Sequence, residues 1–222
     1  MTDTNHKSEE MNLEDIRRDY SVGSLSHSDM TEDPLDKCRE WLEDALRLNV
    51  IEPTALIVST ATLDGQPCTR TVLLKEISEE GKFIFYSNYE SRKGHQIDLN
   101  PKVSLTLLWH QLQRQIHIEG ICQHVAPEVS DAYFAKRPYK SQVGARISPQ
   151  SHPIPNRMFI VTEFAKEALK VGVKVPRPES WGGFEVTPHR IEFWQGRPSR
   201  LHDRFLYLLQ EDGNWSLTRI AP

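Results

Sequence analysis

Two hydrophobic periods alternate along the chain, and the switch between them separates helical from extended stretches. From Pro34 to Asn49, apolar residues recur every three or four positions, which indicates an amphipathic helix. Asp33 is a suitable N-cap for this helix, and a proline is well accommodated at the first helical position. We expect one stripe of the helix to face the core: Leu35, Cys38, Trp41, Leu42, Ala45 and Leu46.

After Pro53 the period becomes two and β-branched residues dominate, as in half-buried strands. Asp64-Gly65 is a strong hairpin signal between the first two of these strands. Ser91 is placed to cap a short helix that ends before Pro101. The strands expected in this half cover residues 54–62, 69–77, 82–87, 103–109 and 114–122. Five antiparallel strands with short turns predict a barrel or a sandwich.

The second half is expected to begin with helices and to end with strands. Helices are predicted over 127–136, 138–147 and 156–171, the last with a core stripe of Phe159, Ile160, Phe164 and Leu169. Further strands are predicted over 184–187, 190–195, 204–210 and 215–220. The fold class is therefore mainly β with flanking helices (α+β). No repeat or linker is evident, so we expect a single domain over 13–222 after a mobile polar tail over 1–12.

Composition narrows the classes of partner. The 222 residues are 26% charged and 38% hydrophobic with a formal net charge of -4, which disfavours nucleic-acid binding through a basic domain. No apolar run approaches the roughly 20 residues of a membrane-spanning helix, and the N-terminus lacks the apolar core of a signal peptide. Three scattered cysteines without a CxxC pair indicate neither a disulfide framework nor a zinc site. We therefore expect a cytoplasmic protein with no nucleic-acid and no membrane partner.

Several familiar catalytic motifs do not occur in the sequence. There is no GxGxxG, no GxxxxGK[ST], no HExxH and no GxSxG. His110, His117 and His124 are seven positions apart in a strand region, where that spacing changes the face of the sheet, so we predict no metal site. Scattered Arg, Lys, Tyr and Ser residues on a β scaffold instead fit an enzyme whose reactive chemistry is carried by a cofactor.

Positive charge is concentrated in the stretch from Phe193 to Tyr207. If residues 199–207 form a strand, Arg200, His202 and Arg204 share one face, because side chains alternate along a strand. Two guanidinium groups and an imidazole near a tryptophan suit an aromatic, anionic small molecule. The alternative is a solvated edge strand whose arginines pair with the carboxylates at positions 192 and 203.

A second basic feature follows Ser91. Arg92 and Lys93 fall in the first turn of the expected helix, where cations are unfavourable with respect to the helix dipole. A bound anion removes this conflict, because the free backbone N–H groups and both cations then point at it. The pattern predicts a phosphate site, and the alternative is two exposed basic side chains.

These stretches resemble a known family. The matching segments are RTVLLK (70–75), Phe83 with FYSNYESRKGHQ (85–96), QRQ (113–115), WGGF (181–184), IEFWQGRPSRLHDRFLY (191–207) and the C-terminal TRIAP. Together they resemble the pyridoxine/pyridoxamine 5'-phosphate oxidases from about Ile16 to Pro222, and the segment with RLHDR is highly specific. The resemblance implies an antiparallel FMN-binding split β-barrel and a homodimer with two flavin sites across the subunit interface.

The resemblance also assigns roles by position. FMN contacts are assigned to Arg70, Thr71, Val72, Leu73, Leu74, Lys75, Tyr86, Ser87, Arg92, Lys93, Gln115, Gln150, Ser151, Trp194 and Arg204. The substrate phosphate is assigned to Lys75, Tyr133, Arg137 and Ser141. A flap over the site is assigned to Arg17, Arg18, Asp19 and Tyr20, and the substrate ring to Arg200, Leu201 and His202. Two departures from the family pattern are Glu52, where Asp is expected, and Arg146, where a large aromatic residue is common.

The implied reaction is oxidation of pyridoxine or pyridoxamine 5'-phosphate to pyridoxal 5'-phosphate. Hydride passes from substrate C4' to FMN, and oxygen reoxidises the flavin to give hydrogen peroxide. Arg200 and His202 are the implied catalytic residues: Arg200 holds the ring, and His202 orients it or assists proton movement. Two other hypotheses are a non-catalytic carrier of flavin or pyridoxal phosphate on the same fold and an RNA-binding barrel, which the acidic balance disfavours.

Overall fold

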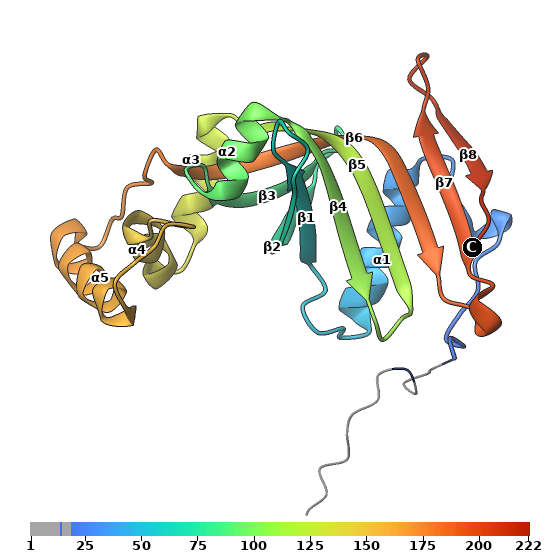
Figure 1. Cartoon of the computed structure of the whole chain (residues 1–222), viewed down its shortest axis with the longest axis horizontal. Helices are drawn as coiled ribbons and strands as arrows, with labels where there is room; N and C mark the ends of the chain where they lie inside the picture. Colours follow the sequence, from blue (N-terminus) through green and yellow to red (C-terminus); the bar gives the residue numbers. More distant parts are fainter. Residues whose placement is uncertain (1–13, 15–18) are drawn as a thin grey trace, which may run out of the picture.

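In the described part of the chain, eight antiparallel strands form one continuous sheet, and six of them close into a barrel (Figure 1). The computed structural model describes residues 14 and 19–222, so the expected tail over 1–12 and the flap residues Arg17 and Arg18 lie outside the described residues. The strands are β1 (Ala55–Ala61), β2 (Pro67–Ile77), β3 (Phe83–Asn88), β4 (Lys102–Trp109), β5 (Arg114–His124), β6 (Trp181–Gln195), β7 (Asp203–Leu209) and β8 (Trp215–Arg219). Their order is β3-β2-β1-β4-β5-β6-β7-β8, and a second pairing between β3 and β6 closes the barrel.

The barrel interior follows from the alternation of apolar residues. In β1, every second side chain is buried, and Leu56 and Val58 are fully enclosed. Leu105 and Leu107 of β4 lie opposite them, and Ile116 of β5 lies opposite Leu107. Each such side chain contributes about 1.5–3 kcal/mol when fully buried, so the interior provides most of the driving force for closure.

One strand replaces two that the sequence predicts in the last third of the chain. Breaks were expected around residues 188–189, but β6 runs without interruption from Trp181 to Gln195. The register with β5 shifts between Glu119 and Gly120, and Pro188 lies opposite Gly120. A Cβ atom at residue 120 would lie 2.4 Å from the carbonyl oxygen of Thr187, so glycine permits this close approach. The bulge lets β6 bend, with its first part against β3 and its second part against β7.

Among residues 19–222, five α-helices flank the barrel. They are α1 (Pro34–Arg47), α2 (Arg92–Leu99), α3 (Pro127–Lys136), α4 (Tyr139–Ile147) and α5 (Arg157–Val171), together with the 3-10 helices η2 (His27–Asp29) and η3 (Pro198–Arg200). On α1 the side chain of Asp33 accepts a hydrogen bond from the backbone N–H of Leu35, as expected of an N-cap. The buried Trp41 of this helix meets Phe193 edge-on at a centroid distance of 5.2 Å. None of the helices in the described range is long and apolar enough to cross a membrane.

Two predicted core stripes are only partly correct. Leu46 of α1 is 51% exposed, because the helix turns this side chain away from the barrel. No residue of α5 is buried, and Leu169 is 89% exposed. Phe164 packs against a second apolar cluster around Phe134 and Trp181, which lies under the helices rather than in the barrel.

Strand β7 (Asp203–Leu209) agrees to within one residue with the strand predicted over 204–210, but the longer strand considered over 199–207 does not form. Residues 198–200 form η3, and β7 starts at Asp203. Ser199 and Arg200 have φ values of 56° and 61°, the left-handed region that non-glycine residues rarely adopt. Arg200 and His202 therefore do not share a strand face with Arg204; they stand on the turn that precedes the strand.

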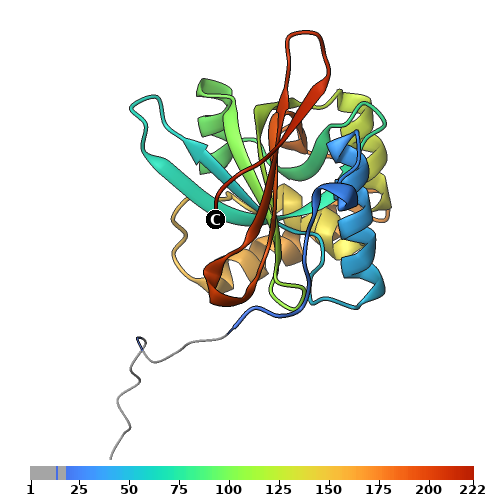
Figure 2. The ribbon, with the colours of Figure 1, turned by 90° about the vertical axis from the view of Figure 1, so that its right-hand side faces the viewer.

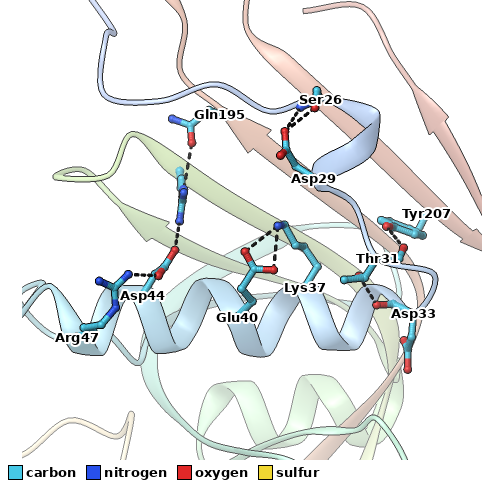
Figure 3. A network of polar contacts seen from close by, with 11 residues as sticks. Ser26, Asp29, Thr31, Asp33, Lys37, Glu40, Asp44, Arg47, Gln195 and Tyr207 are labelled. Atoms are coloured by element: carbon cyan, nitrogen blue, oxygen red, sulfur yellow. Dashed lines mark hydrogen bonds and ion pairs between the residues drawn. The ribbon is translucent and has the colours of Figure 1, made fainter.

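Polar contacts fasten the segment before α1 and the helix itself to the far end of the sheet (Figure 3). The hydroxyl of Tyr207 donates to the carbonyl oxygen of Thr31 at 2.6 Å. Asp44 of α1 and Gln195 of β6 are joined through the guanidinium of Arg114, at 2.8 Å and 3.0 Å. Figure 2 shows α1 and this segment beside the β7–β8 hairpin. The N-terminal segment is thus held close to the turn that carries Arg200 and His202.

Candidate active site

The barrel is split along one edge of β2. Strand β3 pairs with β2 only over Leu74–Ile77, whereas β1 pairs with it over Pro67–Leu73. The first part of β2 therefore offers a free strand edge, with backbone donors and acceptors directed into the gap. The register shifts between Leu74 and Glu76, so Lys75 stands at the irregularity where the strands part. Bulges of this kind re-aim a side chain, and Lys75 lines the cleft beside it.

A cleft of about 1010 Å³ opens at this split, near the upper end of the range for small-molecule sites. Strand β2, helices α2 and α3, and the loop at residues 150–151 line it. Its lining contains six cations: Arg70, Lys75, Arg92, Lys93, Lys136 and Arg137. The described lining contains no carboxylate. We call this the cationic cleft, and its uncompensated charge suits an anionic ligand.

Lys93 is the most enclosed cation of the cleft, with 6% of the residue exposed. Its ammonium group donates to the hydroxyls of Ser87 at 2.6 Å and Ser91 at 2.7 Å, and to the amide oxygen of Gln150 at 2.7 Å. All three acceptors are neutral. Burial, with a smaller contribution from the charge of Arg70, lowers the pKa of Lys93 to about 8. The first-turn position predicted for Arg92 and Lys93 is confirmed, and Ser91 caps α2 through its side chain.

Arg70 is held in place from behind. One guanidinium nitrogen donates to the carbonyl oxygen of Val58 at 3.0 Å and to the hydroxyl of Thr60 at 2.8 Å. The amide oxygen of Gln96 accepts from Thr60 at 2.6 Å and lies 3.4 Å from the other terminal nitrogen of Arg70. Burial lowers the pKa of Arg70, whose charge therefore lacks full solvation.

A layer of aromatic rings forms the opposite part of the cleft. The rings of Tyr86 and Tyr133 stack at 3.8 Å, and Tyr86 also stacks with Trp181 at 5.6 Å. The guanidinium of Arg137 lies 4.3 Å from the centre of the Trp181 ring. One of its terminal nitrogens, Nη1, is buried and has no hydrogen-bond partner among the described residues. A buried, unpaired guanidinium nitrogen on the wall of a cleft requires an acceptor, and a ligand is the natural one.

A second group of predicted site residues lies elsewhere on the sheet. Gln115, Trp194 and Arg204 occupy directly opposed positions on β5, β6 and β7. The residues beside them in sequence, Ile116 and Phe193, point into the core, so this row lies on the outer face. We call Gln115, Trp194 and Arg204 the outer row. Arg204 pairs with the buried Glu192 at 2.7 Å, as the alternative interpretation of this stretch foresaw.

The turn before β7 places His202 beside the outer row. The imidazole lies 4.6 Å from the Trp194 ring, and Tyr20 meets both rings edge-on at 5.5 and 5.7 Å. Burial, and secondarily the charge of Arg200, lowers the pKa of His202. His202 and Leu201 also line a small hollow of about 390 Å³ formed with the C-terminal residues 219–222. Arg200 and Asp19 are exposed.

On one chain these two groups are apart. None of the outer row, His202, Arg200 or Tyr20 lines the cationic cleft. Strands β1 and β4 separate β2 from β5 in the sheet. Figure 1 places α4 and the β7–β8 hairpin toward opposite ends of the longest axis of the molecule. A site that uses both groups must therefore draw them from two copies of the chain.

The other predicted residues divide in the same way. The cleft lining includes Thr71, Val72, Leu73, Tyr86, Ser87, Gln150, Ser151, Tyr133 and Ser141. The side chain of Leu74, by contrast, packs in the core. Neither departure from the family pattern lines the cleft: Glu52 is exposed, and Arg146 pairs with Glu167 at 2.6 Å between α4 and α5.

Reasoning from sequence gave no role to several residues of the site. Trp181 and Gln96 lie in the quoted motifs WGGF and SRKGHQ, but a motif does not say which of its members contact a ligand. Lys136 lines the cleft at the end of α3, and nothing in its spacing distinguishes it from a surface lysine. In the described range, no group of three His, Cys, Asp or Glu side chains is arranged to hold a metal ion.

Comparison with known proteins gives a consistent result. A family model described as pyridoxamine 5'-phosphate oxidase matches residues 37–170, and one described as the pyridoxine 5'-phosphate oxidase C-terminal dimerisation region matches residues 181–222. The chain is 63% identical to a pyridoxine/pyridoxamine 5'-phosphate oxidase of Porphyromonas gingivalis strain W83, over 96% of this chain and 100% of that protein. It is 56% identical to the protein of the same name from Bacteroides thetaiotaomicron, over 95% of this chain and 99% of that protein.

Solved structures show the same architecture. PhzG from Burkholderia lata 383, in complex with tetrahydrophenazine-1-carboxylic acid, superposes with a TM-score of 0.84 at 29% identity, over 91% of this chain and 100% of that one. A pyridoxamine 5'-phosphate oxidase-related, FMN-binding protein from Nostoc punctiforme reaches 0.70 at 15% identity, over 87% and 100%, which shows the fold alone. The family resemblance and the split-barrel fold predicted from the sequence are confirmed.

Proposed function

The chain belongs to the pyridoxamine 5'-phosphate oxidase family, and on that basis we propose that it oxidises pyridoxine and pyridoxamine 5'-phosphate to pyridoxal 5'-phosphate. Oxygen is reduced to hydrogen peroxide, and with the amine substrate water is consumed and ammonia released. The cationic cleft is the observation that carries this proposal. Six cations without a carboxylate in a cleft of about 1010 Å³ match a site that must hold two organophosphates.

The residues present fit FMN. The buried Lys93 and Arg70 are hydrogen-bonded to neutral groups, and the phosphate of FMN would supply the negative charge that pairs with them. Arg92 adds a third cation at the N-terminus of α2. The free edge of β2 over residues 70–73 offers backbone hydrogen bonds to a planar ring system. When bound, FMN supplies the two-electron acceptor for the oxidation.

We assign the substrate phosphate to the other cations of the cleft. Arg137 lines the cleft with Lys75, Tyr133 and Ser141, and one of its guanidinium nitrogens has no hydrogen-bond partner among the described residues. The aromatic stack under Arg137 limits the rotation of its side chain, so less entropy is lost when the phosphate binds. Holding the substrate by a group remote from the reacting carbon positions that carbon for reaction.

We further propose that a second copy of the chain completes each site. The region matched as a dimerisation region includes β6, β7 and β8, which carry Trp194, Arg204 and the turn with Arg200 and His202. A two-fold symmetric homodimer brings this part of one copy to the cationic cleft of the other, and does so twice. Arg200 and His202 then hold the substrate ring, while Gln115, Trp194 and Arg204 contact the flavin.

The unpaired state of the three cysteines supports a reducing, cytoplasmic location.

The test of this function is direct. Protein purified with added FMN should show a flavin absorbance spectrum and should release peroxide when given pyridoxine 5'-phosphate, with equal amounts of aldehyde formed. A protein that binds flavin but turns over neither phosphorylated substrate would instead be a carrier. A protein that stays colourless and inactive with excess FMN would contradict both readings.

A further inference from the structure

Asp203 joins three separate parts of the chain at the start of β7. Its Oδ2 atom accepts a hydrogen bond from the backbone N–H of Leu25 at 3.0 Å and lies 3.4 Å from Nε of Arg197. Its Oδ1 atom pairs with the guanidinium of Arg219 from β8. The residue is only 7% exposed. A buried carboxylate with one amide and two guanidinium partners is a fixed point for the elements that meet on it.

Arg197 connects Asp203 to the turn that carries Arg200 and His202. Its Nη1 atom donates to the carbonyl oxygen of Gly23 at 3.0 Å, so the guanidinium bridges Asp203 and the N-terminal segment. Its backbone N–H donates to Nδ1 of His202 at 3.1 Å. The six-residue span from Arg197 to His202 is thereby closed by a hydrogen bond between its ends.

The closed span contains strained backbone. Ser199 and Arg200 have φ values of 56° and 61°, and neither is glycine. Such residues hold this conformation only where the surroundings over-determine it, and they concentrate at functional sites. The contacts of Arg197 supply that constraint in this turn. Loss of the carboxylate at position 203 would free Arg197 and let the turn relax.

The same contact selects a tautomer of His202. A neutral imidazole has one N–H donor and one acceptor nitrogen. The hydrogen-bond partner of one nitrogen determines which of the two carries the proton. Because Nδ1 accepts from the backbone of Arg197, the proton of the neutral ring resides on Nε2. His202 therefore offers a hydrogen-bond donor at Nε2.

We propose that Asp203 is a positioning residue: through Arg197 it holds the turn that presents Arg200 and keeps His202 in its Nε2–H tautomer. This inference rests on the proposed function, since it assumes that Arg200 and His202 contact the substrate. Asp203 itself touches neither substrate nor flavin. Through Leu25 and Gly23 it also fixes the segment that carries Tyr20, so one carboxylate aligns the turn and the residue that covers it.

The test compares Asp203→Asn with Glu211→Gln, an acid-to-amide change at an exposed position beside β7. Long-range ¹H–¹⁵N spectra of histidine-labelled protein, with His202 assigned from a His202→Gln variant, report the tautomer. We expect wild type and Glu211→Gln to show a single Nε2–H form, and Asp203→Asn to show averaged nitrogens. Turnover should fall about 10-fold or more in Asp203→Asn, while flavin content and the KM for substrate change little.

Each outcome decides the proposal. Asp203→Asn with an unchanged tautomer and unchanged turnover would overturn it. If that variant does not fold, the wild-type spectrum still decides, since an Nδ1–H form of His202 would contradict the role of Arg197. Failure of the proposed function is separable: a wild-type protein inactive on phosphorylated substrates would contradict the function, while the tautomer comparison still tests the positioning.

Discussion

The ammonium group of Lys93 lies 2.7 Å from the amide oxygen of Gln150, and no carboxylate in the described part of the chain pairs with it. Lysines buried to this degree normally have an acidic partner or lose their proton. Lys93 instead has three neutral acceptors and a pKa lowered to about 8 by burial. This arrangement leaves the lysine ready to form an ion pair with a ligand, and the phosphate of FMN is the proposed partner.

Removing that charge should weaken retention of flavin. In Lys93→Ala we expect FMN affinity to fall about 10- to 100-fold, the usual cost of one charge-assisted hydrogen bond. Lys174→Ala, at an exposed position outside the cleft, is the matched control and should bind FMN as wild type does. Fluorescence titration of apo-protein with FMN measures both. An affinity in Lys93→Ala equal to that of the control would refute the assignment.

The lowered pKa of Lys93 predicts two opposite pH dependences. FMN affinity should fall as pH rises through about 8, because the free protein then loses the charge that binds phosphate. The stability of apo-protein should respond the other way. The pKa of Lys93 is about 8 in the folded protein and near 10.5 in the unfolded chain. Between these pH values the unfolded chain binds more protons, so the free energy of unfolding rises with pH. Denaturant titrations of wild type and Lys93→Ala between pH 7 and 10 measure the free energy of unfolding at each pH. If it changes with pH by the same amount in both proteins, the prediction is contradicted.

Arg137 should act on the phosphate of the substrate and not on the flavin. We expect Arg137→Ala to raise the KM for pyridoxine 5'-phosphate about 10- to 100-fold with flavin content unchanged, since it loses a charged contact to phosphate. Unphosphorylated pyridoxine is the internal control, because its weaker turnover should be the same in wild type and variant. An equal loss with both substrates would show that the residue supports the fold, through its contact with Trp181, and not the phosphate.

Arg200 should affect the rate and leave the flavin in place. We expect Arg200→Ala to lower kcat about 100-fold or more, because the substrate ring is no longer held in line with the flavin. Arg157→Ala, an exposed arginine at the start of α5, serves as the control. Absorbance gives the flavin content, and a peroxide-coupled assay gives the rate. Normal kinetics in Arg200→Ala would remove the role assigned to it.

Most of the fold could be predicted from the sequence, because hydrophobic period and turn residues are local signals. The bounds of α3 agree with the prediction, and the strands of the first half are shifted by only a few residues. The continuity of β6, where the sequence predicts two strands, could not be foreseen, because it depends on the space that Gly120 leaves on the neighbouring strand β5. The stripe of α5, in which Phe164 is packed but Leu169 is exposed, shows that helical periodicity indicates amphipathicity but not which partner covers the face.

The site was predicted in two different ways. The helix-dipole conflict at Arg92 and Lys93 is a local feature that by itself predicts an anion site, and both residues line the cleft. The shared strand face of Arg200, His202 and Arg204 was wrong, because contacts of Arg197 with distant residues hold residues 198–200 in a turn. The single-domain assignment stays a prediction, supported by the pairing of β6 from the second matched region with β3 and β5 from the first.

The central claim is that the cationic cleft of one copy and the turn of another form one site, and complementation between variants tests it most directly. Arg137→Ala and Arg200→Ala damage different halves, so co-expressed chains should form mixed dimers in which one of the two sites contains only wild-type residues. With random pairing, and with substrate well below the wild-type KM so that the Arg137→Ala parent is nearly inactive, activity should return to about a quarter of the wild-type level. Co-expression of Arg137→Ala with Lys75→Ala, which damage the same half, should restore nothing. If the first mixture is no more active than its two parent proteins, the shared site is contradicted.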